Sequence, residues 1–229
     1  MCKCYFTSTG DETGRGPQNV LLKQKFWGGR SLGRTRREKS IMKLLMHTCC
    51  APCSVYCIDS LRSEDIEPTL FWYNPNIHPY IEYKTRRDCL KDYAGRAGVK
   101  LIIDEEYGLD EFCRNVVSDI PNRCVNYCYK KRLTETVRYA AKNGYDAFTT
   151  TLLVSPYQKH EELKKVCEEL AALSGVQFVY RDFRVGFREG QAKARELGLY
   201  MQKYCGCIFS EEERYQKQIA KDLANNLDS

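Results

Sequence analysis

The sequence predicts an α/β fold, a three-layer α/β/α domain with a mainly parallel sheet of about five strands. Two observations lead to this prediction. From residue 42 onward, short apolar runs alternate with longer amphipathic segments, which is the order that successive strand–helix units produce. Four of the short runs also end in unusual polar stretches, and functional residues collect at the carboxyl ends of strands in such sheets.

The short apolar runs are expected to be the strands, because each is bounded by turn residues or by an amphipathic segment. The first is KLLMH, and the second, TLFWYN, leads into the turn NPNIHP. The expected strands are residues 43–47, 69–74, 99–104, 146–153 and 176–182. Strands that are separated by helices pair in parallel, so the sheet should be Rossmann-like.

The amphipathic segments are expected to be helices, and several carry end signals. Pro52 falls in the first turn of the helix after the first strand, where proline is favoured. Gly98 and Gly144 stand where two later helices should end. The expected helices are residues 52–64, 82–98, 109–117, 129–144, 160–175, 186–198 and 210–223.

The net charge of +6 lies entirely in the first 41 residues. These hold nine Lys/Arg and three Asp/Glu, whereas the remaining 188 residues hold 27 of each sign. The segment is also rich in Gly, Arg and Ser and lacks helix or strand periodicity. We therefore expect residues 1–41 to be a disordered basic extension, and 42–229 to be one metal-binding catalytic domain. Met42 directly precedes the first strand, so translation could also start there.

The chain has 13 cysteines, but it does not resemble a secreted disulfide scaffold. Such scaffolds are short and carry a signal peptide, and neither feature is found here. No stretch approaches the roughly 18 apolar residues of a membrane span. We therefore expect a cytoplasmic protein without a membrane partner, in which clustered thiols bind metal or take part in chemistry.

Seven cysteines fall into three groups that chemistry should explain: Cys49-Cys50-x-x-Cys53, Cys124-x-x-x-Cys128 and Cys205-Gly-Cys207. A four-iron cluster and a structural zinc each take four thiolates, so seven exceed the needs of either alone. Spacing favours thiolate-bound metal over dithiol redox chemistry and does not choose between zinc and iron–sulfur. The isolated cysteines at 89, 113 and 167 are expected to be small core residues, as is Cys57.

The local context predicts how individual sulfurs are placed. Successive strand residues point to opposite faces, so Cys49 and Cys50 should face different ligands or neighbouring centres. Cys53 should lie in the first helical turn, whose positive end favours the thiolate. Gly206 lacks a Cβ and can allow Cys205 and Cys207 to turn toward one place.

Several motifs together resemble the QueH-type epoxyqueuosine reductases. They are HTCCAPC after the first strand, RC…CYKKRL, FTTTLLVSPYQK, the DF of YRDFR, and GLYMQKYCGCIFS. They occur in the family's order from about residue 43 to 215. Two departures are present: three residues separate Cys124 from Cys128 where the family pattern has two, and Cys53 is not cysteine in every member.

The resemblance implies removal of the epoxide oxygen from epoxyqueuosine at the tRNA wobble position. It also implies a [4Fe-4S] cluster and an adjacent mononuclear iron, held by cysteines of all three groups. The ligand pool carried over by motif is Cys49, Cys50, Cys128, Cys205 and Cys207, together with Cys53 and Cys124. The partners would be a tRNA bearing epoxyqueuosine and an electron donor that the sequence does not identify, with no role for DNA.

Position on the expected rim of the sheet suggests further roles. Proton donors could be Tyr157, Lys159 and Asp182. The basic run beside the second cysteine pair should contact anticodon phosphates, with an aromatic residue stacking on an unpaired base. The residues expected there are Arg123, Tyr129, Lys130, Lys131 and Arg132.

Three other functions are considered. An ATP-using or tRNA-thiolating enzyme is disfavoured, because TCCAPCS stands where its glycine- and serine-rich phosphate loop would be. A zinc-stabilised RNA-binding module predicts colourless protein with tetrahedral zinc and no open site. A dithiol–disulfide reductase would use Cys50 and Cys53 alone and would work without metal.

Overall fold

The computed structural model describes residues 42–227 of the chain. The expected basic extension, residues 1–41, lies outside the described residues. Five strands form one parallel sheet in the order β3-β2-β1-β4-β5. They are β1 (Leu44–His47), β2 (Pro68–Trp72), β3 (Leu101–Ile103), β4 (Ala147–Thr150) and β5 (Gln177–Phe178). The predicted α/β fold with a parallel five-stranded sheet is confirmed.

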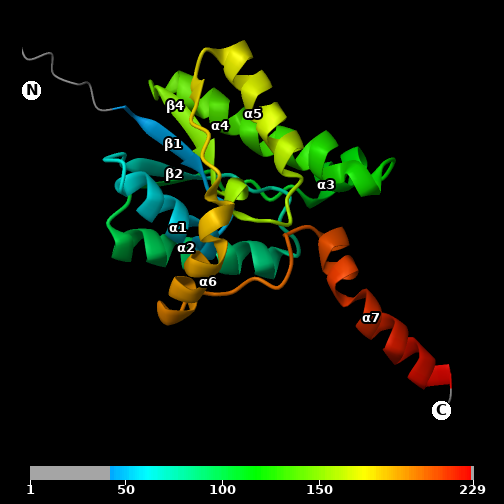
Figure 1. Ribbon diagram of the computed structural model, residues 1–229. Helices are drawn as coiled ribbons and strands as arrows, with labels where there is room; N and C mark the ends of the chain where they lie inside the picture. Colours follow the sequence, from blue (N-terminus) through cyan, green and yellow to red (C-terminus); the bar gives the residue numbers. More distant parts are fainter. Residues whose placement is uncertain (1–41, 228–229) are drawn as a thin grey trace, which may run out of the picture. The chain divides into compact units, whose positions relative to one another are not determined.

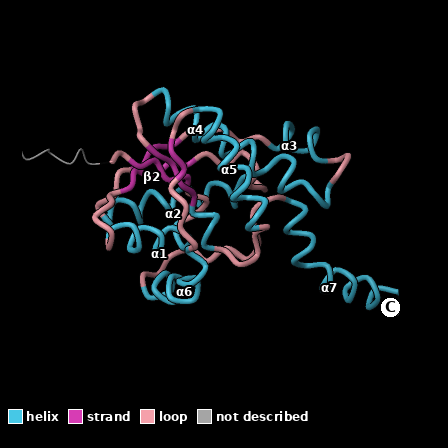
Figure 2. Tube along the Cα trace, turned by 45° about the horizontal axis from the view of Figure 1, so that its top comes forward, coloured by secondary structure: helices cyan, strands magenta, loops and turns pink. Residues whose placement is uncertain are grey.

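Helices cover both faces of the sheet, which makes three layers (Figure 1). One face carries α1 (Ala51–Arg62), α2 (Tyr80–Ala97) and α6 (Phe187–Glu196). The other carries α4 (Lys130–Lys142) and α5 (His160–Ser174). Figure 2 shows the sheet strands between these two helical layers. Two further helices, α3 (Leu109–Val116) and α7 (Ile208–Leu227), lie beside the carboxyl ends of the strands.

β1 is the central strand, and its position explains its composition. Every residue of LLMH is buried, because helices cover both faces of a parallel sheet. Leu44 is in register with Pro68 of β2 on one side and with Ala147 of β4 on the other. The polar His47 ends the strand within hydrogen-bonding distance of Thr150 Oγ1, at 2.9 Å, so the sheet's buried carboxyl edge is polar.

Two strands are shorter than predicted. β4 ends at Thr150, because the side chain of that threonine accepts a hydrogen bond from the backbone N–H of Leu152 and starts a 3₁₀ turn. The predicted fifth strand over 176–182 has only two residues in the sheet, Gln177 and Phe178. It is an edge strand that pairs with β4 alone, and few of its backbone groups find a partner there.

The contact between α6 and α1 is close because two glycines lie in it. A Cβ on Gly186 would overlap the ring of Tyr56, and one on Gly190 would come within 3.0 Å of Tyr56 Cβ. The amino-terminal half of α6 is therefore fixed against α1, the helix that follows the first cysteine group. This contact places α6 at the carboxyl edge of the sheet.

Candidate metal centre

The first cysteine group lies where the topology of the sheet reverses. Connections leave β1 toward β2 in one direction and return to β4 on its other side, and ligands bind at such switch points in open α/β sheets. The loop after β1 is tied to the 3₁₀ turn that follows β4 by one hydroxyl. Thr151 Oγ1 accepts from the backbone N–H of Cys49 at 3.2 Å and donates to Cys49 Sγ at 3.5 Å.

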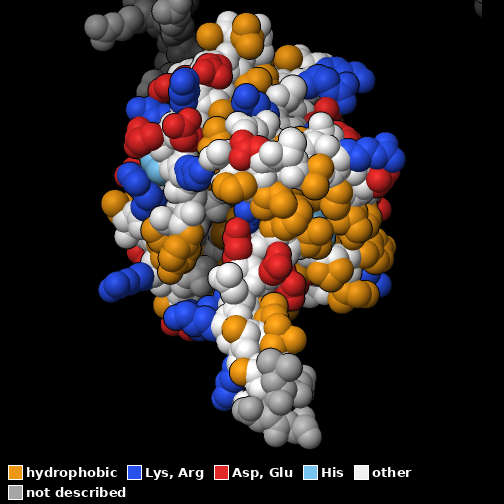
Figure 3. All heavy atoms as spheres, turned by 90° about the vertical axis from the view of Figure 1, so that its right-hand side faces the viewer, with side chains coloured by type: hydrophobic (Ala, Val, Ile, Leu, Met, Phe, Trp, Pro, Cys, Tyr) orange, Lys and Arg blue, Asp and Glu red, His pale blue; other side chains and the backbone are white. Residues whose placement is uncertain are grey.

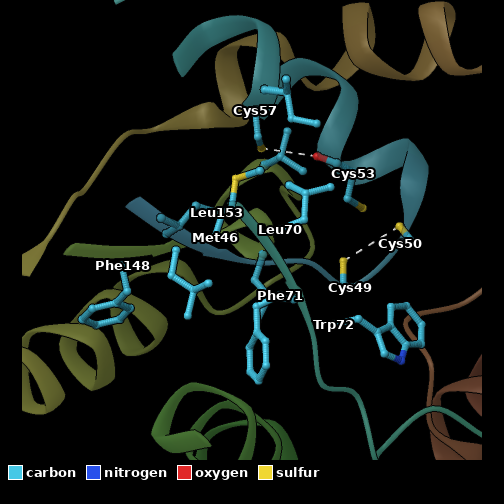
Figure 4. Close-up of a cluster of buried hydrophobic side chains, with 14 of the residues drawn as sticks. Met46, Cys49, Cys50, Cys53, Cys57, Leu70, Phe71, Trp72, Phe148 and Leu153 are labelled. Atoms are coloured by element: carbon cyan, nitrogen blue, oxygen red, sulfur yellow. Dashed lines mark hydrogen bonds between the residues drawn. The ribbon is translucent and has the colours of Figure 1, made fainter. Parts of the chain in front are cut away.

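Cys49, Cys50 and Cys53 form a compact sulfur triad, with all three Sγ atoms within 4.8 Å of one another. The sulfurs of Cys49 and Cys50 lie 3.8 Å apart, and Figure 4 shows them facing each other. The expectation that these two side chains diverge is wrong, because β1 ends at His47 and strand alternation does not continue beyond it. The extended Cys50 instead precedes α1 directly, at φ −173° and ψ 164°.

The triad has one acidic and two less acidic thiols. The pKa of Cys49 lies well below its usual value, because Cys50 and Cys53 donate hydrogen bonds to its sulfur. Burial raises the pKa of Cys50, and proximity to the other two sulfurs raises that of Cys53. The environment thus lowers the pKa of Cys49, and not that of Cys53, for which the sequence predicted a thiolate. A buried thiolate with two neighbouring thiols suits a soft metal ion, since thiolates are the ligands such ions select.

All three cysteine groups open onto one cleft of about 1170 Å³. Segments that lie about 150 residues apart in the chain thus meet there, as the sequence predicted. Cys50 lies just behind this wall, in contact with Cys49. The cysteines that line the cleft are Cys49, Cys53, Cys124, Cys128, Cys205 and Cys207.

The second cysteine pair lies in a short π-helix, Cys124–Tyr129. The wider turn of this helix accommodates the third residue between the two cysteines, and π-turns of this kind are frequent at functional sites. The Cys128 thiol donates to the Cys124 sulfur, and this lowers the pKa of Cys124 to about 6. Arg123, Arg132 and Lys159 act in the same direction. Because the π-helix accommodates the extra residue, the sulfurs of Cys124 and Cys128 remain in contact.

The Cys205-Gly-Cys207 loop is held by two buried arginines. Arg86, paired with Glu82 of the same helix at 2.7 Å, donates to the carbonyl of Cys205 at 2.8 Å. Arg123 donates to Cys207 Sγ at 3.4 Å. Gly206 has a φ of 159°, and a Cβ there would lie 3.1 Å from Ile77 Cγ1, so glycine suits the loop as predicted.

Two glutamine side chains donate to sulfurs and were not anticipated from the sequence. Gln202 Nε2 is 3.0 Å from Cys50 Sγ and 3.6 Å from Cys53 Sγ. Gln158 Nε2 is 3.5 Å from Cys205 Sγ. Amide donors of this kind stabilise thiolates and tune a bound metal. Gln202 precedes Cys205 by three residues, and this closeness was the available sequence signal.

The basic run of the second group, which was expected to contact tRNA, is mostly buried, and Arg123, Tyr129 and Arg132 line the cleft. Arg123 is occupied by Cys207 and by Glu213, and Arg132 Nε donates to the carbonyl of Cys128. The ring of Tyr129 is 1% exposed and cannot stack on a base in this conformation. Lys131 pairs with Glu111 at 2.8 Å.

Lys130 is the one residue of that basic run with an exposed side chain. The sequence did not reveal this burial, because the π-helix and the first turn of α4 direct Arg123 and Arg132 inward, toward the cysteines. Charge counted along the sequence does not show on which side of a helix each charge lies.

The three expected proton donors divide into two sets. Tyr157 and Lys159 line the cleft, and the backbone N–H of Lys159 is held by the hydroxyl of Tyr129 at 3.1 Å. Asp182 is not among the cleft-lining residues. Its carboxylate caps the 3₁₀ turn that follows and pairs with Arg184, which lowers its pKa to about 2. An ionised capping carboxylate is a poor proton donor.

Comparison with known proteins places this arrangement in a family. The sequence model described as "Epoxyqueuosine reductase QueH" matches residues 44–213, a range that includes all three cysteine groups. The chain belongs to the QueH family of epoxyqueuosine reductases. This confirms the resemblance seen in the sequence motifs. The match to QueH also begins after residue 41, so the basic segment lies outside it.

Individual QueH relatives agree over the same range. The chain is 38% identical to "Epoxyqueuosine reductase QueH" of Dehalococcoides mccartyi over 175 residues, which are 76% of this chain and 96% of the relative. It is 34% identical to the protein of that name in Thermotoga maritima, over 76% of this chain and 93% of the relative. For the Histophilus somni protein the identity is 32%, over 73% of this chain and 72% of the relative.

Among residues 42–227, no helix has both the length and the apolar character to cross a membrane.

Proposed function

We propose that this chain is an epoxyqueuosine reductase that acts on tRNA, using a [4Fe-4S] cluster and an adjacent iron. The observation that supports this most directly is the convergence of six cysteines at one cleft, with a seventh, Cys50, directly behind its wall. A single four-iron cluster takes four thiolates, so the remaining sulfurs suit a second metal. The reaction, reduction of epoxyqueuosine, is inferred from membership in the QueH family.

The donor set around the cleft fits such metals. The environment lowers the pKa of both Cys49 and Cys124, the latter to about 6, which favours the thiolate form that metals bind. Gln158 and Gln202 supply N–H donors to sulfur, which is the support that thiolate ligands require. We propose that cysteines of all three groups hold the cluster and the iron. When bound, they would supply single electrons and a Lewis-acidic site for the epoxide oxygen.

The overall reaction consumes two electrons and two protons, breaks both carbon–oxygen bonds of the epoxide, and gives an alkene and water. The electrons come from an external donor. Lys159 is the best-placed proton source, because it lines the cleft and lies close enough to Cys124 to lower that thiol's pKa. Its ammonium also reaches Asn122 Oδ1 at 3.3 Å, which holds the side chain near the cleft.

Anaerobic purification tests the proposal. We expect a brown protein with more than four irons per chain, which converts epoxyqueuosine to queuosine in tRNA when a reductant is supplied. Mass spectrometry of the digested tRNA would show the loss of one oxygen atom. Stoichiometric zinc in a colourless protein would instead support the RNA-binding module, and activity without any metal would support the dithiol reductase.

Cysteine variants provide the matched comparison. Cys124→Ala and Cys205→Ala should lose iron and activity, since both sulfurs line the cleft. Cys167→Ala should keep both, because this buried core residue of α5 is not among the cleft-lining residues. Equal iron content in all three variants would contradict the assignment of the site.

A further inference from the structure

The outer wall of the cleft carries cations that no carboxylate neutralises. They come from α6, from the segment after it and from α7, and within residues 42–227 none forms an ion pair. The only acidic side chain that lines the cleft in this part of the chain, Glu213, is already paired with Arg123 at 2.7 Å. These cations are Arg188, Arg195, Lys203 and Arg214.

Exposed cations without an ion pair also occur elsewhere among the described residues, for example Lys84 and Lys165, but these four line one concave surface together. Cations around a concave surface with low-dielectric walls focus a positive potential into it. Figure 3 shows Lys and Arg side chains beside the base of α7. The cleft therefore favours a polyanion over a neutral ligand.

One aromatic side chain in the same wall is unusually exposed. Tyr157 is 84% exposed, although a large aromatic ring gains free energy when it is buried. The ring of Phe187, from α6, packs edge-on against it with centroids 6.0 Å apart at an angle of 83°. The backbone N–H of Tyr157 donates to Ser155 Oγ at 3.3 Å. Tyr157 is thus a supported ring with a free face at the cleft.

Exposed aromatic rings beside unpaired cations are the two elements of single-strand RNA recognition, in which bases stack and phosphates pair with cations. We propose that Tyr157 is the stacking platform for a base next to the modified nucleotide, and that the four cations bind phosphates of the anticodon loop. This inference rests on the proposed function. It moves the tRNA contact from residues 123–132 to the α6 and α7 side of the cleft.

The cation contribution can be tested by binding of an anticodon stem-loop RNA at several salt concentrations. Replacing both Arg188 and Arg195 by Ala should weaken binding and reduce the salt slope by about 0.7 for each phosphate that is no longer neutralised. Lys100→Ala is the control, because Lys100 lies at the opposite, amino end of the strands. Unchanged binding in the double variant, or equal weakening by Lys130→Ala, would overturn the assignment.

The stacking contribution needs a pair of substitutions at one position. Tyr157→Ala should weaken binding of the loop by about tenfold, whereas Tyr157→Phe should retain it, because either ring offers a face to a base. The isolated RNA stem should bind equally to both variants. Unchanged binding in Tyr157→Ala, or equal weakening by Tyr157→Ala and Tyr157→Phe, would refute the platform role.

The same measurements separate this inference from the proposed function. If the wild-type protein reduces epoxyqueuosine but the arginine and Tyr157 variants bind RNA normally, only the proposed RNA-binding surface is refuted. If these variants lose RNA binding but the wild-type protein has no reductase activity, only the proposed reaction is refuted.

Discussion

Two neighbouring threonines allow the tie between the turn after β4 and the cysteine triad to be measured. Thr149 and Thr151 are both completely buried. The hydroxyl of Thr151 accepts from the backbone N–H of Cys49 and donates to its sulfur, whereas that of Thr149 has no partner among the described residues. Valine has nearly the shape of threonine and lacks the hydroxyl, so each replacement isolates the polar contribution.

The expected free energies differ in sign. Thr151→Val leaves a buried N–H without an acceptor, which costs about 1–3 kcal/mol. Thr149→Val removes a buried hydroxyl that has no partner, and this should stabilise the fold by about 1 kcal/mol. The two variants should therefore differ by about 3 kcal/mol, a large part of the roughly 5–15 kcal/mol that stabilises a typical domain.

Urea unfolding of both variants under anaerobic conditions, followed by circular dichroism, measures this difference. Thr151→Val should also bind metal more weakly, because the loop that carries Cys49 is no longer held to the turn after β4. If the two variants were equally stable, the hydroxyl of Thr151 would not hold the triad in place, and the reasoning from its contacts would fail.

Three further predictions concern pH, packing and the support of a sulfur ligand. His78 has its pKa lowered from 6.5 to about 4 by burial, so the unfolded chain binds a proton that the folded chain does not. Stability should fall as the pH drops from about 6.5 toward 4, by about 2 kcal/mol at pH 5, and His78→Gln should remove this loss in urea titrations at pH 7 and 5. Gly186→Ala should lower the free energy of unfolding by about 1–3 kcal/mol, which thermal unfolding measures. A smaller loss of stability in a Tyr56→Ala background would confirm that the ring of Tyr56 obstructs the added Cβ. Gln202→Leu removes the donor to Cys50 Sγ and should weaken metal binding at least tenfold in a chelator competition; unaltered affinity would show that the amide does not support the ligand.

Much of the fold follows from local patterns. The alternation of apolar and amphipathic segments is enough to predict a parallel sheet, because each strand is short and each helix has a periodic face. Pro52 lies in the first turn of α1 and Gly98 ends α2 in a left-handed conformation, as predicted. The fifth strand was predicted too long, because its pairing ends with the hydrogen bond from the Val179 N–H to the carbonyl of Phe148, close to the end of β4 at Thr150.

The site was predicted in part, and the errors share a cause. That the cysteine groups meet follows from strand order, since strand ends converge at one rim. Where each side chain points depends on the last residue of a strand and on helix type. Cys49 and Cys50 therefore lie together, and Arg123 and Tyr129 point inward. Pairing between distant residues, such as Arg123 with Glu213, leaves no local pattern in the sequence.

The assembly of one cleft from three distant chain segments also affects biosynthesis. The ribosome releases Cys205 and Cys207 long after Cys49, Cys50 and Cys53. A nascent chain therefore lacks the third cysteine group until residues 205–207 emerge. The metal centre proposed above would accordingly be completed after translation, and truncated chains that lack residues 205–229 should not bind the full complement of metal.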